Sequence, residues 1–125
     1  MSLLFGFDGR ANRAKWWLIN IATSIVYCLA IAAIGGSAAL SPDPQAAMAA
    51  VGAVGGIILL VLTVAIFWIG LAVAAKRWHD RGKSAWWILI AFVPVIGGLW
   101  YLIECGFLRG TPGANRFGSD PLSAL

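Results

Sequence analysis

Two long apolar stretches, each interrupted by one charged residue, constrain the fold of this chain more than any other feature. From Trp16 to Ala75 the only charged residue is Asp43, and from Ser84 to Leu108 the only one is Glu104. A bilayer core of about 30 Å is crossed by about 20 residues of α-helix. The composition, 61% hydrophobic and 11% charged, also lies outside the usual mix of soluble domains. The sequence therefore predicts a membrane protein.

The apolar stretches divide into three predicted spans, residues 16–40, 46–75 and 85–108. Backbone N–H and C=O groups find no partners in lipid, and the period-two alternation of a barrel strand is absent, so all three should be helices. The motif SPDP at 41–44 ends the first span and begins the second, with Asp43 as N-cap and Pro44 at the first helical position. We expect an all-α membrane protein with a single membrane domain, residues 1–125, a basic loop at 76–84 and a C-terminal tail at 109–125.

The basic residues set the expected orientation. Arg10, Arg13 and Lys15 precede the first span, and Lys76, Arg77, Arg81 and Lys83 lie in the loop between the second and third. By the positive-inside rule the N-terminus and this loop are cytoplasmic, and three spans then leave the C-terminal tail in the periplasm. We expect the first span to be retained, because its apolar run exceeds the roughly 7 to 15 residues of a signal peptide.

The third apolar segment leaves a second topology open. Pro94, followed by Gly97 and Gly98, should kink a helix near its middle. If the chain turned back there, the tail would return to the cytoplasmic face. Each limb would then have only about ten residues, or roughly 15 Å of helix, about half of a full crossing. We therefore favour three full spans.

The loop KRWHDRGKSAWW at 76–87 concentrates the polar chemistry of the chain. One interpretation is structural: Lys76 and Arg77 favour a helix C-terminus, and Asp80 lies at pairing distance from both. Paired tryptophans that follow each basic segment would be interfacial anchors, namely Trp16, Trp17, Trp86 and Trp87. The other interpretation is binding of anionic lipid headgroups or phosphate, because arginine matches phosphate oxygens in bidentate geometry. Its candidate residues are Arg10, Arg13, Lys76, Arg77, His79, Asp80, Arg81 and Lys83.

The sequence gives little support for catalytic activity, a metal site or a nucleic-acid partner. GKS at 82–84 resembles the end of a phosphate-binding loop, but Arg77 stands where the first glycine is required. His79 and Asp80 are adjacent and do not face each other on a helix, and no nucleophile is placed beside them. One histidine and two distant cysteines show no metal-ligand spacing. We expect no enzyme activity and no cofactor, and the positive charge needs no nucleic-acid partner because topology explains it.

Small residues and one acidic residue within the third span bear on assembly and transport. Gly52 and Gly56 form a G-x-x-x-G pair that allows close helix packing, within the chain or between copies in a homo-oligomer. Ionisable residues within spans often line ion paths, but Glu104 should lie near the outer end of the third span. A transporter or channel component is therefore the alternative function.

Three motifs resemble signatures of the YhaH/YhaI-like family of bacterial inner-membrane proteins. They are FDGRANRAKWW at 7–17, AAKRWHDRGKSAWW at 74–87 followed by PVIGGLW at 94–100, and GTPGANRFGSDP at 110–121. The matching positions are Gly9, Arg10, Arg13, Trp16, Arg77, His79, Asp80, Gly82, Ser84, Trp86, Pro94, Gly97, Asn115, Gly118, Asp120 and Pro121. Lys76, Trp78 and Phe117 depart from the common residues. The resemblance implies a small multi-pass protein of the bacterial inner membrane, with a domain of unknown function and no assigned activity.

These observations together predict an accessory or scaffold protein whose cytoplasmic basic and aromatic turns bind anionic phospholipid. The alternative is a small transporter or channel component that assembles as an oligomer. Membrane lipids are the expected partners, with a homo-oligomer or a larger membrane complex as further possibilities.

Overall fold

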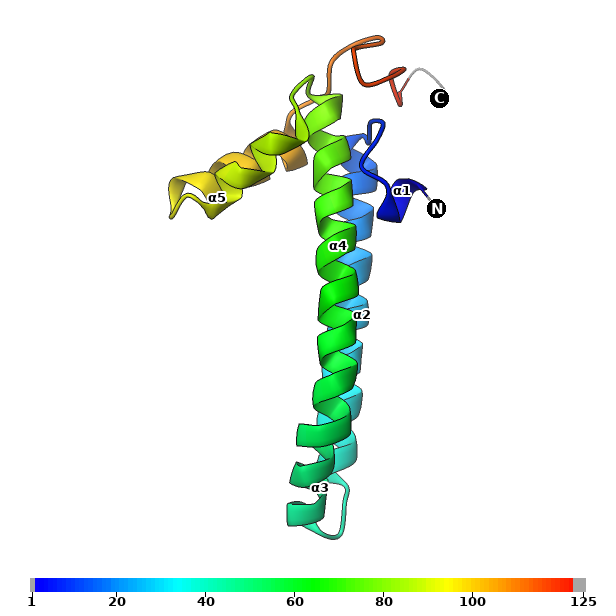
Figure 1. Cartoon of the computed structure of the whole chain (residues 1–125), viewed down its shortest axis with the longest axis vertical. Coiled ribbons are helices and arrows are strands. Elements are labelled where there is room, and N and C mark those ends of the chain that lie inside the picture. The colour runs from blue at the N-terminus through cyan, green and yellow to red at the C-terminus, as the bar shows by residue number, and fades with distance from the viewer. Residues whose placement is uncertain (1, 123–125) are drawn as a thin grey trace. The chain divides into compact units, whose positions relative to one another are not determined.

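The computed structural model describes residues 2–122 and builds them from helices, with no strand among these residues beyond one isolated bridge (Figure 1). In chain order the elements are α1 Ser2–Phe5, α2 Arg13–Ala39, α3 Pro44–Ala50, π-helix η1 Val51–Gly55, α4 Gly56–Asp80, 3-10 helix η2 Ala85–Phe92, α5 Ile96–Leu102 and π-helix η3 Ile103–Phe107. The prediction of an all-helical chain is confirmed.

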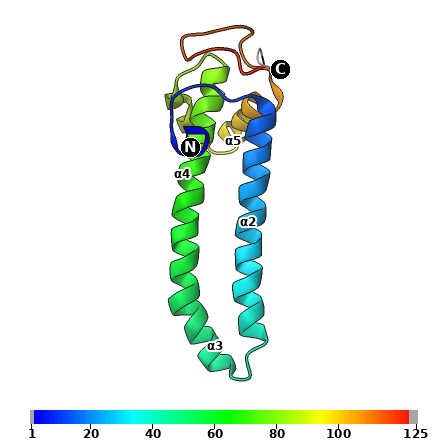
Figure 2. The same ribbon diagram turned by 90° about the vertical axis from the view of Figure 1, so that its right-hand side faces the viewer.

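Internal contacts divide the chain into two compact units. We call Met1–Asn20 with Trp68–Leu125 the terminal unit, and Ile21–Phe67 the central unit. The central unit holds antiparallel parts of α2 and α4, which run side by side in Figure 2. Tyr27 and Thr63 join these helices through a hydroxyl hydrogen bond of 2.9 Å. Asp43 caps α3 as predicted, because its carboxylate accepts from the backbone N–H groups of Gln45 and Ala46.

Helix packing in the central unit depends on Gly55. A Cβ added at Gly55 would lie 2.9 Å from Cγ2 of Ile34 on α2. A Cβ added at Gly52 would have no such neighbour within 4 Å. The only neighbour of a Cβ at Gly56 would be the Val51 carbonyl on the same helix. Within the described residues a Cβ at either glycine would meet no atom of another helix, and close helix packing through Gly52 and Gly56 stays a prediction. One residue turns a helix by about 100°, so Gly56 faces a different direction from Gly55.

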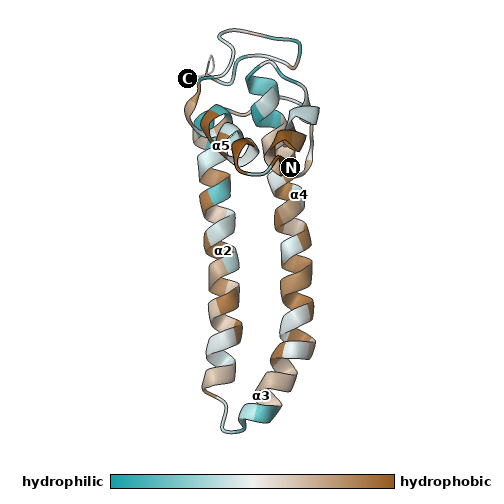
Figure 3. Ribbon diagram, turned by 90° about the vertical axis from the view of Figure 1, so that its left-hand side faces the viewer, coloured by the Kyte–Doolittle hydropathy of each residue, from teal (hydrophilic) through white to brown (hydrophobic). Residues whose placement is uncertain are grey.

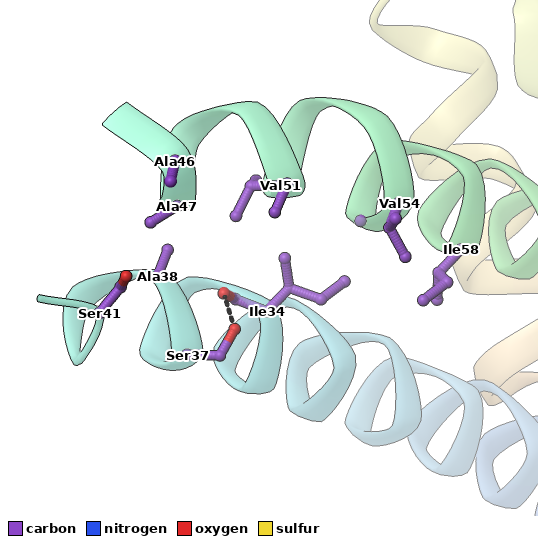
Figure 4. A pocket seen from close by; sticks show the side chains of 11 residues that line it. Ile34, Ser37, Ala38, Ser41, Ala46, Ala47, Val51, Val54 and Ile58 are labelled. Carbon is purple, nitrogen blue, oxygen red and sulfur yellow. Dashed lines mark hydrogen bonds between the residues drawn. The ribbon is translucent and has the colours of Figure 1, made fainter. Parts of the chain in front are cut away.

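A cavity of about 410 Å³ lies within the central unit, between the last turns of α2 and the segment formed by α3, η1 and the start of α4 (Figure 4). Alanine, glycine, serine, valine and isoleucine line it, and no charged side chain does. The Ser37 hydroxyl already donates to the Ile34 carbonyl at 2.8 Å. The cavity therefore offers little polar chemistry to a ligand.

Two helices are long and apolar enough to cross a membrane. They are Arg13–Ala39 and the continuous helical segment Pro44–Asp80. Only 6% and 17% of their most apolar 18 residues are buried inside the structure, so these are not the core helices of a soluble protein. Figure 3 shows apolar residues along both helices. This surface suits lipid, and the first two predicted spans are confirmed as long apolar helices.

The third predicted span is not one helix. Residues 85–108 form an antiparallel pair of short limbs, η2 on one side and α5 with η3 on the other, which we call the apolar hairpin (Figure 1). The limbs approach so closely that a Cβ on Gly97 would overlap the Ile90 carbonyl. Pro94 begins the reversal: the Ile96 N–H donates to the Pro94 carbonyl at 2.7 Å, and Val95 between them has φ 66° and ψ −61°. The predicted single crossing at 85–108 is thus corrected to a hairpin.

Candidate functional site

The three sequence motifs meet in the terminal unit, and Arg10 joins them. Its guanidinium contacts the Asp80 carboxylate, with Nε 3.1 Å and Nη2 3.0 Å from Oδ1. It also donates to the carbonyls of Thr111 and Gly113 in the tail, at 2.6 and 2.7 Å. The Arg10 side chain is only 1% exposed. Its hydrogen-bonding capacity is therefore used inside the protein.

Arg77 holds the end of α4 to the apolar hairpin. Its side chain is fully buried and forms an ion pair with Asp80. Its Nε donates to the Cys105 carbonyl at 2.6 Å, and its Nη2 donates to the Leu108 carbonyl. The predicted pairing of Asp80 within the loop is confirmed for Arg77. Asp80 is thus the common acceptor of two buried arginines.

The tail packs against the end of α4 through backbone contacts as well. The Thr111 N–H donates to the Asp80 carbonyl at 2.6 Å. Gly110 lies against the Asp80 carboxylate so closely that an added Cβ would overlap it. The tail therefore packs against the basic loop, whereas the predicted three spans would separate the two segments across the membrane. The chain reverses at Pro94, and this brings the tail back to the end of α4.

His79 is part of the same contact. Its Nδ1 lies 2.8 Å from the Gly9 carbonyl, which implies that Nδ1 carries a proton and donates. Its ring stacks on Phe117 with centroids 4.0 Å apart and planes at 7°. Asn115 donates to the His79 carbonyl at 2.9 Å. Asp80 faces the arginines, so the two residues do not form an acid/base pair.

The tail has its own tight turn. Asn115 and Gly118 exchange backbone hydrogen bonds of 3.0 and 3.1 Å. The Asp120 carboxylate accepts from the N–H groups of Leu122 and Gly113, and these hydrogen bonds hold the pKa of Asp120 below its ordinary value. The Asn-x-x-Gly-x-Asp pattern thus shapes the loop that packs against His79.

Glu104 forms a second ionic group where the apolar hairpin meets the basic loop. Its Oε1 pairs with Lys83 and lies 3.5 Å from Nε of Arg81, and its Oε2 accepts from Nε1 of Trp100 at 2.7 Å. The Lys83 ammonium also lies 4.4 Å from the ring centroid of Trp87. Glu104 was expected near the outer interface, far from this loop. The reversal of the hairpin brings it back beside Lys83.

The predicted tryptophan anchors divide into two pairs. Trp16 is 4% exposed and belongs to the core cluster with Ile19, Val73, Trp78 and Cys105. Trp17 donates through Nε1 to the Gly106 carbonyl at 2.7 Å. Both therefore contact the hairpin, and their role as interfacial anchors stays a prediction. Trp86 and Trp87 are 78% and 38% exposed and remain accessible to a membrane interface.

The predicted headgroup candidates also divide by exposure. Internal hydrogen bonds and ion pairs occupy the side chains of Arg10, Arg77, His79 and Asp80. Lys76 is 3% exposed, and its Nζ has no hydrogen-bond partner among the described residues. Arg81 and Lys83 are partly exposed, and Arg13 is exposed. Sequence reasoning missed Arg109 and Arg116, both exposed in the tail, because it placed the tail on the other face. The basic residues of the turn-rich tail were the available signal.

Comparison with known proteins gives consistent matches over almost the whole chain. Residues 4–119 match the family described as Protein of unknown function (DUF805). The chain is 35% identical over 119 residues to the inner membrane protein YhaH of Escherichia coli K12, covering 93% of this chain and 87% of the relative. It is 31% identical over 128 residues to inner membrane protein YhaI of the same strain, covering 93% and 86%. No solved structure matches it.

Proposed function

This chain belongs to the DUF805 family and is a protein of the bacterial inner membrane, and we propose that it is an accessory or scaffold protein whose terminal unit binds anionic phospholipid headgroups. Binding, with no catalytic step, is the proposed role, because His79 and Asp80 already serve the internal contacts. The proposal concerns the cytoplasmic leaflet.

The distribution of charge supports this orientation. All nine basic residues lie in the terminal unit, and Asp43 is the only charged residue of the central unit. By the positive-inside rule both ends of the chain and the basic loop are cytoplasmic. The chain then crosses the membrane twice, through α2 and through the segment that includes α4. The apolar hairpin enters only one leaflet, since eight residues of 3-10 helix are about 16 Å long.

The observation that carries the proposal is a set of four basic residues with exposed side chains. Arg13, Lys15, Arg109 and Arg116 are all exposed, and none forms an ion pair within the described residues. Arg13 donates to the Phe107 carbonyl at 2.7 Å, so it lies close to the segment that contains Arg109. Each basic group near an anionic leaflet contributes about 1 kcal/mol of attraction. Four such groups would give a clear preference for anionic lipid.

The test is the composition of lipid that co-purifies with the protein. Replacing all four residues by glutamine should lower the ratio of phosphatidylglycerol to phosphatidylethanolamine measured by mass spectrometry. A matched variant with Arg13→Lys, Arg109→Lys and Arg116→Lys keeps the charge and should keep the ratio. If the parent protein carries the same ratio as the bulk membrane, the proposal is wrong.

A transporter or channel component remains the second candidate, and the observation in its favour is the Tyr27 and Thr63 hydrogen bond within the apolar central unit. Polar contacts at such depth often mark a path for ions or substrate. Glu104 gives this candidate no support, because its two carboxylate oxygens contact Lys83, Arg81 and Trp100. Ion flux into proteoliposomes that Tyr27→Phe abolishes would favour it over the lipid-binding proposal.

A further inference from the structure

We propose that a groove on the apolar hairpin is a binding site for one acyl chain of an anionic phospholipid, with the lipid phosphate at the basic residues beside Glu104. The groove has a volume of about 470 Å³. Its apolar walls are Ile96, Leu99, Ile103 and Leu108, and Lys83 and Glu104 line its polar part. This inference rests on the proposed function and assigns that function a defined site.

The groove changes from apolar to polar along the helix. Ile96, Leu99 and Ile103 follow a helical spacing of three to four residues and therefore share one face of α5 and η3. Ile96 begins α5 beside the turn of the hairpin, and Glu104 lies eight residues later, or about 12 Å along an α-helix. Glu104 contacts Lys83 of the basic loop. An amphiphile can thus place its chain toward the turn and its headgroup toward the loop.

The polar part of the groove carries more positive than negative charge. Arg81 and Lys83 both pair with Glu104, which is the one acid among them. Arg81 also donates to the Arg109 backbone carbonyl, which ties this region to the tail. Nε of Arg81 is buried without a hydrogen-bond partner among the described residues. This excess positive charge is complementary to a phosphate group.

Lys83 and Arg81 keep N–H donors that can bind such a phosphate. An ammonium group has three N–H donors, and the Lys83 side chain is 29% exposed while one of its donors serves Glu104. Arg81 is 26% exposed and presents a planar guanidinium, which suits phosphate oxygens. Glu104 therefore orients the cations and leaves them able to bind a second anion.

A bilayer lipid is favoured over a water-soluble anion because the groove belongs to a surface that is itself apolar and exposed. Ile96, Leu99 and Ile103 are 65%, 58% and 50% exposed, and Phe92 on the other limb is 68% exposed. Such a surface needs lipid around it, so a chain can enter the groove sideways from the membrane. A free phosphate or glycerol phosphate would use the cations but not the apolar walls.

The test fills the groove without changing its charge. Leu99→Trp places a larger side chain on the groove wall, and Leu102→Trp makes the same change on the same helix outside the groove lining. Purified proteins in detergent are titrated with dioleoyl phosphatidylglycerol and examined by native mass spectrometry. We expect about tenfold weaker binding for Leu99→Trp, the effect of withdrawing about two methylenes from an apolar site. Leu102→Trp should bind as the parent does.

Two further probes separate the parts of the proposal. Dihexanoyl phosphatidylglycerol and inorganic phosphate should bind the parent more weakly than the long-chain lipid. Lys83→Gln should reduce the preference for phosphatidylglycerol over phosphatidylethanolamine. Ile103→Phe, a smaller increase in volume, gives a second measurement if Leu99→Trp does not fold.

The possible failures are distinguishable. If the parent prefers phosphatidylglycerol but both tryptophan variants bind it equally well, the groove is not the site, although the proposed function stands. If the parent shows no headgroup preference, the proposed function fails. Tight binding of inorganic phosphate, unchanged in Leu99→Trp, would identify a site for a soluble anion and overturn the assignment to lipid.

Discussion

Asp80 is the residue on which the terminal unit most depends, because it neutralises two arginines that have almost no contact with solvent. Arg77 is completely buried and the Arg10 side chain is 1% exposed. The two guanidinium groups bring α4, the hairpin and the tail together through backbone carbonyls. A buried cation that loses its partner is costly, so the carboxylate is needed for the fold itself.

We predict that Asp80→Asn lowers the stability of the protein by about 3 to 5 kcal/mol, the usual cost of removing one partner from a buried ion pair. Thermal unfolding in detergent measures the change, and limited proteolysis should find the tail exposed. Asp8→Asn removes the same charge at an exposed position and should have little effect. Equal melting temperatures for the two variants would contradict a structural role for Asp80.

Val95 carries backbone strain at the turn of the hairpin. Its φ of 66° and ψ of −61°, with the hydrogen bond from Ile96 to Pro94, define a γ-turn of the rare form in which the central residue has positive φ. A β-branched residue is unfavourable there, and the side chain is 82% exposed, so it loses little packing when removed. Val95→Gly should therefore stabilise the protein by about 1 kcal/mol. A lower melting temperature for this variant would show that the turn has a different backbone conformation.

At the scale of elements, the apolar hairpin was only partly predictable. Pro94, Gly97 and Gly98 indicated a break, and the alternative of a re-entrant segment followed from them. The length and hydrophobicity of residues 85–108 nevertheless satisfy the requirements of a full span, so the local sequence favoured a single helix over a hairpin. The contacts that hold residues 85–108 as a hairpin beside α4 join Arg77 to Cys105 and Leu108, which are 28 and 31 residues away in the sequence. No local sequence pattern reveals such contacts.

Gly97 is the position at which the two limbs of the hairpin come closest. We predict that Gly97→Val separates them and costs about 1 to 3 kcal/mol or more, since the new side chain would overlap the Ile90 carbonyl. The adjacent Gly98 has open space around it, so Gly98→Val is the matched control. Near-ultraviolet circular dichroism should report the change, because Trp87 and Trp100 stack across the limbs with centroids 6.3 Å apart. An unchanged spectrum in Gly97→Val would contradict the packing of the hairpin.

At the scale of the whole molecule, the sequence predicted the parts that depend on composition and missed those that depend on chain reversal. The two long helices and the Asp43 cap follow from hydropathy and local capping patterns. The candidate site in the loop stays a prediction, and the structure adds which of its residues are buried in internal contacts. Arg10 and Asp80 are 70 residues apart, and their pairing requires the N-terminal segment and the end of α4 to lie together. Consequently, Arg109 and Arg116 could be recognised as candidate site residues only once the fold was known.

The last prediction concerns the side of the membrane on which the C-terminus lies. The tail bonds to Arg10 and to the Asp80 carbonyl, so we expect it to share a side with the basic loop, and by the positive-inside rule we expect that side to be the cytoplasm. Fluorescent protein fused after Leu125 should fluoresce, and alkaline phosphatase fused there should be inactive. The same phosphatase inserted in the loop at 41–43 should be active, because that loop connects the two spans on the opposite face. Phosphatase activity at the C-terminus would require a third full crossing, which would break the contacts of Arg10 and Arg77 and remove the basis for a lipid site at the hairpin.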